Sequence, residues 1–598
     1  MKKYLLTCLA IAYTLFGCQK GVLDKVPLNV ISDAQVWGDQ VLIDAYLTEA
    51  YARTYIFLNE TGGNEWDTGA GWAAPFAINH ISDEGRTNWT SVAGPLGYYF
   101  KMGGLTVNGG LLEWWEESYQ VIRITNEFIE KMATASVDET FRKQRVAEAR
   151  FIRAFNYFAM VKRYGGVPLI TKAQRLDDPH EELYPRRESE KAIYDFILSE
   201  MDAIVTDLPS QATGDHYGRP SMYAALALKS RAALYAASIS EYGQVQLDGL
   251  LGIPKEMAQG YFQQAYEAAN KIITDNKFSL YDEDVDKVTN FRNLFLKKNN
   301  SEVIFVRPHT FTDRDRGGNG WSYDFFQTPA PNAWGAGNVD APYLEMAEEF
   351  EKIDGTQGTL DRTAIQQGLW TAEALWQDRE PRFFATIYTL NTAWKGTRLD
   401  WHNGLITPDG TLLADGSYEG VLAKGNQQVD GSFGTGFGVM KYLDESKNNL
   451  GERGTSGTDW IIFRYGEVLL NFAEAAYALG NSEAARLTIN EIRQRAGVAQ
   501  HTSIDLAKIK HERKVELAYE GHRYWDLRRW RTAVTDLTRG FSGLRYILDY
   551  NTRKYRIEVI SDIDGSVSPP RFRPENYYFP ITPGRIGQNE SLIPNPGY

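Results

Sequence analysis

Apolar residues recur along much of the chain at the spacing of amphipathic helices, and the helices that they predict come in pairs. The clearest pair covers residues 460–496. Its first half carries apolar residues on one helical face, at i, i+7, i+10, i+14 and i+17: Ile462, Leu469, Phe472, Ala476 and Leu479. Its second half repeats the pattern with Ala485, Ile489, Ile492 and Ala496. We expect the first helix to end at Gly480, Ser482 to cap the second, and Gly497 to end it.

Other segments follow the same pattern. Residues 111–132 are predicted to pair with 138–164, residues 191–208 with 221–240, and residues 261–276 form a further helix downstream. Two helices joined by a tight turn, with Ala where they must approach closely, resemble a tetratricopeptide unit of about 34 residues. The pairs share no strict motif. Together they predict an all-α fold, in which stacked tetratricopeptide-like helix pairs form a curved scaffold.

Two long segments, residues 50–110 and 280–460, interrupt this pattern. They are rich in Gly, Asn, Asp, Trp and Pro and show little sustained periodicity, although residues 302–307 predict an isolated strand. Irregular segments of this length in a compact domain are usually functional. We therefore expect loop-rich insertions that form a ligand face on one domain, residues 18–598, with no interdomain linker.

The N-terminus has the pattern of a bacterial lipoprotein signal. Two Lys follow Met1, and the apolar residues 4–16 are too few for a membrane-spanning helix, which needs about 20. Leu15-Phe16-Gly17-Cys18 resembles the lipobox, in which the Cys is acylated and becomes the first mature residue. We predict a signal peptide over residues 1–17 and lipidation of Cys18, which would anchor the protein to a membrane. The alternative is ordinary cleavage beside an incidental Cys.

Composition and charge narrow the class of function. The chain has 598 residues with 77 acidic and 64 basic side chains, and its hydrophobic content of 43% is that of a globular protein. A net charge of -13 argues against nucleic acid, whose phosphates need a basic surface. The only two Cys, Cys8 and Cys18, lie at the N-terminus, which excludes a disulfide framework and a Cys-based zinc site from the rest of the chain.

Catalytic and metal-binding templates are absent. The chain has no Walker A, Gly-x-Ser-x-Gly or His-Glu-x-x-His sequence. Asp282, Asp284 and Asp286 resemble the start of a calcium loop, but Lys287 and Asn293 stand where Gly and a bidentate Glu are needed. We interpret the three acids as solvated surface and predict no metal, no cofactor and no enzyme. Paired carboxylates for glycoside hydrolysis stay an open alternative, because no pair stands out among the acids.

A charged segment over residues 512–530 predicts a helix held by ion pairs. Glu512, Glu516 and Glu520 recur every four residues beside Arg513, Arg523 and Arg529. This spacing favours ion pairs along one helix face, so a structural charge network is a better interpretation than acid–base catalysis.

Aromatic residues inside the polar segments give the stronger signal for function. A flat aromatic ring offers broad contact at small entropic cost, and a nearby Asp or Asn can bond hydroxyl groups, which suits a sugar ring. We predict ligand contacts in two clusters. The first contains Trp66, Asp67, Trp72, Asp83, Asn88 and Trp89, and the second contains Trp321, Tyr323 and Trp334, with Asp324 beside them. The alternative is that each Trp fixes its loop to the scaffold as a small satellite core.

Several segments resemble the SusD/RagB family of Bacteroidetes lipoproteins. They are residues 148–168, 463–475, 512–530, 578–582 and 595–598, and the resemblance spans nearly the whole mature chain. One departure is Gly466, which replaces a more usual Ala in the Arg-Tyr-x-Glu segment and need not change the fold.

The resemblance implies a scaffold of four tetratricopeptide-like pairs with a ligand-binding loop face. It also implies a lipid-anchored, outward-facing position on the outer membrane, as the lid of a SusC-like TonB-dependent transporter. A captured glycan would be enclosed and passed to the transporter. Binding residues vary within the family, so the two aromatic clusters rest on this chain alone. Peptide is the alternative ligand, a surface glycoside hydrolase is an alternative activity, and structural scaffolding of the transporter without a ligand is a third.

Overall fold

The computed structural model describes residues 33–54, 57, 77–87, 100–110, 112–310, 321–329, 332, 338–425, 434–452, 454–564 and 571–598. Its longer helices are α3 (Gln40–Arg53), α6 (Glu116–Met132), α7 (Glu139–Tyr164), α9 (Glu190–Ile204), α10 (Met222–Tyr242), α11 (Ala258–Thr274), α12 (Lys287–Leu296), α16 (Tyr465–Ala478), α17 (Ser482–Ala496) and α18 (Leu506–Glu516). Its shorter helices include α2 (Asp33–Val36), α4 (Ala77–His80), α8 (His180–Leu183), α13 (Tyr323–Gln327), α14 (Leu344–Glu349), α15 (Pro381–Thr386), α19 (Arg523–Arg529), α20 (Ala533–Asp536) and α21 (Pro583–Gln588).

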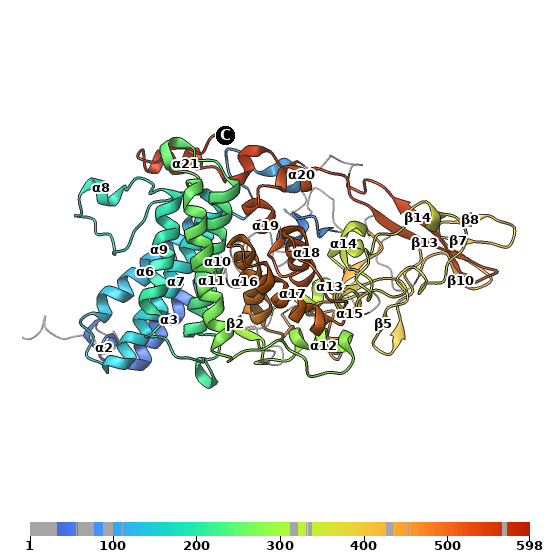
Figure 1. The fold of residues 1–598 in the computed structure, drawn as a ribbon, viewed down its shortest axis with the longest axis horizontal. Helices are drawn as coiled ribbons and strands as arrows, with labels where there is room; N and C mark the ends of the chain where they lie inside the picture. Colours follow the sequence, from blue (N-terminus) through green and yellow to red (C-terminus); the bar gives the residue numbers. More distant parts are fainter. Residues whose placement is uncertain are drawn as a thin grey trace, which may run out of the picture.

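The long helices pack side by side and form the scaffold (Figure 1). α6 packs on α7, α7 on α9, α9 on α10, and α10 on α11; α16 then packs on both α11 and α17. The largest hydrophobic core fills the space between them. In α10, fully buried Ala224, Ala232 and Ala236 have the small side chains that let neighbouring helices approach closely. The predicted stacking of helix pairs is confirmed, and the fold is mostly helical.

Polar caps fix the starts of these helices. The Asp138 carboxylate accepts hydrogen bonds from the first turn of α7, and the Ser189 and Ser221 hydroxyls do so for α9 and α10. Among the described residues, no helix is both long and apolar enough to cross a membrane. The scaffold helices are amphipathic or buried within the protein.

The best-defined predicted pair differs from the prediction at two boundaries. Gly497 ends α17 in the left-handed conformation, at φ 74°, as expected. Asn481, however, caps α17 in place of Ser482, and its side chain accepts from the Ala484 N–H. Trp460–Arg464 forms strand β12, because these residues pair with β2 (Val303–Arg307) instead of extending the helix. The strand predicted over residues 302–307 is confirmed.

The segment predicted as a loop-rich insertion over residues 280–460 holds more regular structure than expected. Its short strands are β3 (Asp340–Pro342), β4 (Ile387–Tyr388), β5 (Ala393–Trp394), β6 (Thr397–Arg398), β7 (Leu405–Ile406), β8 (Leu412–Leu413), β9 (Ser417–Tyr418), β10 (Val421–Leu422) and β11 (Gly438–Val439). A second core, with Trp376, Trp394 and Trp401, fills this part. These strands pair with partners far apart in sequence, so local periodicity does not reveal them.

The remaining strands join distant segments. β1 (Gly85–Thr87) pairs antiparallel with β3, and β4 with β11. The long hairpin of β13 (Gly543–Asp549) and β14 (Tyr555–Ile560) forms a four-stranded sheet with β7 and β8, in which β13 and β7 are parallel. This sheet projects from the end of the molecule opposite α3 and α6 (Figure 1).

The charged segment over residues 512–530 is two helices, so the prediction of one helix is wrong. α18 ends at Glu516 and α19 begins at Arg523. Between them, Tyr519 has φ 60° and Gly521 has φ 78°, which a right-handed helix cannot accommodate. The turn carries Glu520 to Arg464 and Lys441, which are buried ion-pair partners from outside this segment.

Candidate functional site

The predicted ligand contacts fall partly outside the described residues. Trp66, Asp67, Trp72, Asn88, Trp89 and Trp334 all lie there. Asp83, Trp321 and Tyr323 are described, and all three are buried. Their burial gives no support to a role as ligand contacts, which stays a prediction, and it agrees with the alternative that such residues fix loops to the protein.

Trp321 belongs to a small aromatic core beside the scaffold. Its side chain is 1% exposed, and its indole N–H donates to the Thr458 carbonyl at 2.9 Å. The His309 ring stacks on it with centroids 5.0 Å apart and planes 11° from parallel. Burial, together with the charges of Arg307 and Lys298, lowers the pKa of His309 to about 3, so this ring is neutral at ordinary pH.

Tyr323 opens the short helix α13 in the same aromatic core. Its hydroxyl donates to the Lys441 carbonyl at 2.5 Å, and its ring lies 4.9 Å from Trp321. The next residue, Asp324, accepts from the Lys447 ammonium at 3.0 Å. The structure thus brings Trp321 and Tyr323 together, with Asp324 tied to a neighbouring loop.

Asp83 lies in a separate, charged environment between α4 and β1. It accepts hydrogen bonds from Arg523 at 2.8 and 2.9 Å and from the Lys514 ammonium at 3.0 Å. Burial alone would raise the pKa of Asp83, but the positive charges of Arg523 and Lys514 outweigh it and hold the pKa well below its usual range. Asp83 therefore ties the first irregular segment to α18 and α19.

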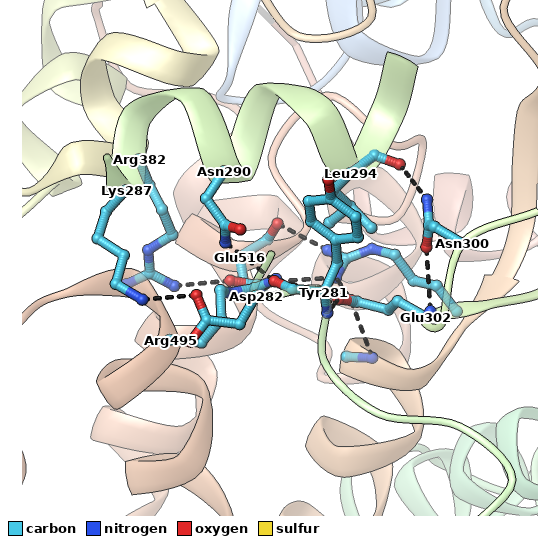
Figure 2. Close-up of polar contacts among 12 residues, drawn as sticks. Tyr281, Asp282, Lys287, Asn290, Leu294, Asn300, Glu302, Arg382, Arg495 and Glu516 are labelled. Carbon is cyan, nitrogen blue, oxygen red and sulfur yellow. Dashed lines mark hydrogen bonds and ion pairs between the residues drawn. The ribbon is translucent and has the colours of Figure 1, made fainter. Parts of the chain in front are cut away.

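A buried network of Arg and Glu joins the scaffold to the strand-rich part. Figure 2 shows its centre beneath α12: Arg495 contacts Glu302 at 3.1 Å and also pairs with Glu516, and Glu516 reaches Arg382 at 2.9 Å. Burial alone would raise the pKa of Glu516, but the surrounding Arg residues, Arg495 foremost, lower it. The charge network inferred from the sequence is present, although it is buried in the protein and not spread over a solvated face.

The acidic residues that resembled a calcium loop have structural partners. Asp286 caps α12 through the Thr289 N–H at 2.9 Å, and Asp282 pairs with Lys287. Asp284 accepts from Asn293 and Tyr281. In the described part of the chain, no group of three His, Cys, Asp or Glu residues has a metal-binding arrangement.

Two cavities on the scaffold were not foreseen from the sequence. One, of about 230 Å³, lies between β2 and the loop before α10, where Thr213, Arg219 and Asn300 line it. The other, of about 450 Å³, lies between α6, the segment after α7, and α21. Each is built from residues far apart in the chain, so no sequence motif marks it. The larger one has Trp115 and Tyr119 beside the carboxamides of Gln120 and Gln588.

The stacked helix pairs and the strand-rich extension define a helical-repeat scaffold. The SusD family model matches residues 301–598, and a second model, described as starch-binding associating with outer membrane, matches residues 102–234. The chain belongs to the SusD family.

Relatives and solved structures agree with this assignment along almost the whole length. A SusD-like protein of Bacteroides ovatus is 23% identical over 95% of this chain and 88% of its own length. The crystal structure of a SusD-like protein from Bacteroides fragilis, 26% identical, matches 96% of this chain and all of its own with a TM-score of 0.71. A laminarin binding SusD-like protein, 21% identical, matches 94% of this chain and all of its own with a TM-score of 0.58.

Proposed function

We propose that the protein is a cell-surface glycan-binding lipoprotein that captures oligo- or polysaccharide and delivers it to a SusC-like TonB-dependent transporter. The observation that carries this proposal is the pair of SusD-family matches, which cover both the scaffold and the strand-rich part. The solved laminarin binding relative supports the choice of glycan as ligand. The protein acts by binding, without catalysis and without a cofactor.

Capture and transfer would follow from two states of the lid. The scaffold helices share one large core, so the movement would take place at the junction with the transporter. A ligand shifts such an equilibrium only if it binds the closed state more tightly than the open state. Glycan enclosed between the lipoprotein and the transporter contacts both, which supplies this difference in affinity.

Ligand contacts are assigned to the first irregular segment and to Trp334. Trp66, Trp72, Trp89 and Trp334 would stack on sugar rings, and Asp67 and Asn88 would bond hydroxyl groups. Asp83, Trp321 and Tyr323 are buried and close to these segments in sequence, and they would hold the ends of these segments in position.

The lipid anchor is assigned to Cys18. Acylation there places the protein on the outer membrane, facing outward, with the scaffold held close to its transporter. Metabolic labelling with an alkyne fatty acid tests this assignment: the wild-type protein should carry the label, and Cys18→Ser should not. Label on Cys18→Ser would contradict it.

Affinity electrophoresis and calorimetry over defined glycans test the binding function. We expect retarded migration in at least one neutral polysaccharide, no release of reducing ends, and unchanged affinity after EDTA treatment. Release of products would identify a glycosidase, and binding of a peptide mixture but of no glycan would identify a peptide importer. Either result contradicts the proposal.

Variants of the assigned ligand contacts test the location of the glycan site with the same binding measurements. Trp72→Ala and Trp89→Ala should each weaken glycan binding by about tenfold or more, the loss of one stacked ring. The matched control is Phe384→Ala, which removes an aromatic ring that is 38% exposed on α15. Equal affinities of all three variants and the wild type would contradict the site assignment.

A further inference from the structure

The larger cavity, of about 450 Å³, has the size of a small-ligand site, which is typically about 300–1,000 Å³. Its walls come from the start of α6, from residues 168–185 and from α21, near the protruding α8 and away from β2 (Figure 1). Asp83, Trp321 and Tyr323, the predicted ligand contacts that the structure describes, do not line it. Its described lining residues all differ from the residues assigned to the glycan site in the loops.

One wall of the cavity is aromatic and rigidly supported. Trp115 packs edge-on against Tyr119, with ring centroids 5.3 Å apart. The Arg585 guanidinium lies 5.1 Å from the centre of the Trp115 ring, and Glu113 holds this Arg through an ion pair of 2.6 Å. Tyr119 is half-buried, and its hydroxyl donates to the Pro168 carbonyl at 2.9 Å. Trp115 itself is buried, at 8% exposure, so Tyr119 is the ring that a ligand can reach, and Trp115 fixes its position.

The charges on the cavity wall are already compensated. Arg123 pairs with Glu127 at 2.7 Å, and Lys172 pairs with Glu182. Arg585 is held between two carboxylates: it pairs with Glu113 at 2.6 Å and with Glu116 at 3.1 Å. Because each cation on the described wall has a carboxylate partner, an anionic ligand would compete with a carboxylate already in place, which favours a neutral ligand.

Two carboxamides at the rim keep hydrogen-bonding capacity. The Gln588 side chain makes no hydrogen bond within the described part of the chain, and this residue is exposed beside the cavity. The Gln120 side chain accepts only a long contact, 3.5 Å from Arg53, so its amide protons stay available. Carboxamides offer both donors and acceptors, as hydroxyl groups require.

We propose that this cavity is a second carbohydrate-binding site, specific for a neutral sugar. The apolar face of one sugar ring rests on Tyr119, which the buried Trp115 supports from behind, while Gln120 and Gln588 bond its hydroxyl groups. A hydrocarbon chain would leave both carboxamides without partners, and a charged ligand would find no unpaired countercharge. Combined with the loop site, two contacts along one polysaccharide would raise the retention of long chains over short ones.

A fluorine reporter tests this site directly. The protein is labelled with 5-fluorotryptophan, and the Trp115 signal is identified by its absence from Trp115→Phe. The probes are maltohexaose, laminarihexaose, cellohexaose and xylohexaose, each at about 10 mM, which nearly saturates a site with a Kd of about 1 mM. We expect at least one probe to shift the Trp115 signal. The shift should be lost in the double variant Gln120→Ala/Gln588→Ala and kept in Gln263→Ala, an exposed Gln on α11.

Each outcome decides the question. The proposal is overturned if no neutral oligosaccharide shifts the Trp115 signal. It is also overturned if only trigalacturonate, a charged oligosaccharide tested in parallel, shifts the signal, or if the shift survives in the double variant. Signals of the loop residues Trp72 and Trp89 report on the other site in the same spectrum. If Trp115 responds while those signals stay unchanged, the second site stands and the proposed loop site fails.

Discussion

At the residue scale, buried charge determines what a single substitution costs. The Asp83 side chain has no exposed surface and faces both Arg523 and Lys514. Removing one partner of a buried ion pair leaves the other charge without compensation, which costs about 3–5 kcal/mol.

Replacing Asp83 by Asn should therefore lower the free energy of unfolding by about 3–5 kcal/mol, as measured by urea denaturation followed by circular dichroism. The matched control is Glu483→Gln, which breaks the exposed pair with Arg486, where the Glu side chain is 65% exposed. That control should cost less than about 1 kcal/mol. Similar losses in the two variants would show that the Asp83 pairs contribute no more than surface contacts.

Single residues also show why the sequence did not reveal which aromatic side chains bind ligand and which belong to the core. Trp321 and Tyr323 lie in a polar, Gly-rich neighbourhood, as sugar-binding rings often do, and this part of the pattern is local. Their partners, however, are His309, Thr458 and Lys441, which belong to other segments. Whether a ring faces solvent depends on such distant partners, so local composition could not separate a binding ring from a core ring.

At the element scale, glycines mark where helices cannot continue. Gly521 lies in the turn between α18 and α19 at φ 78°, and an added Cβ would meet the Ile78 side chain at 3.6 Å, an ordinary contact. The cost of a side chain at Gly521 is therefore backbone strain alone, about 1–2 kcal/mol for a left-handed conformation.

Gly521→Ala should accordingly lower the free energy of unfolding by about 1–2 kcal/mol. Gly260 provides the opposite case, because it lies inside α11 with ordinary helical geometry and open space around its Cα. Gly260→Ala should raise stability by up to about 1 kcal/mol, since Ala loses less backbone entropy in a helix. Urea denaturation of both variants measures the difference, and a change of the same sign in both would contradict this account.

Helical elements were predictable because their signals are local. The apolar periodicity of α7, α10 and α17 and the caps at Asp138 and Ser221 are contained within each helix. The break between α18 and α19 and the strand β12 were missed, because both depend on partners elsewhere in the chain. The reason for Gly466 also lies outside its own segment. A Cβ at this position would lie 2.3 Å from an Arg464 guanidinium nitrogen, which buried carboxylates hold in place, so a side chain does not fit there.

At the scale of the whole molecule, distant segments meet around Glu84, and its ionisation contributes to global stability. Glu84 accepts from the Tyr519 N–H at 2.8 Å, although the two residues are far apart in the chain. Burial raises the pKa of Glu84 to about 7 from an ordinary value of 4.5, and the neighbouring charge of Asp83 adds to this effect. The folded protein thus keeps a proton on Glu84 that the unfolded chain releases at lower pH.

The sign of the resulting pH dependence follows from proton binding. Between about pH 4.5 and pH 7 the folded state binds more protons than the unfolded state, so stability from Glu84 falls as the pH rises. The loss of stability approaches about 3 kcal/mol above pH 7, since each pKa unit corresponds to about 1.4 kcal/mol.

Glu84→Gln keeps an acceptor for the Tyr519 N–H and does not ionise. Urea denaturation of both proteins from pH 4.5 to pH 8 should show the variant gaining stability relative to wild type through this window, with no further change at higher pH. A difference that is constant, or that shrinks as the pH rises, would mean that Glu84 titrates alike in the folded and unfolded chains.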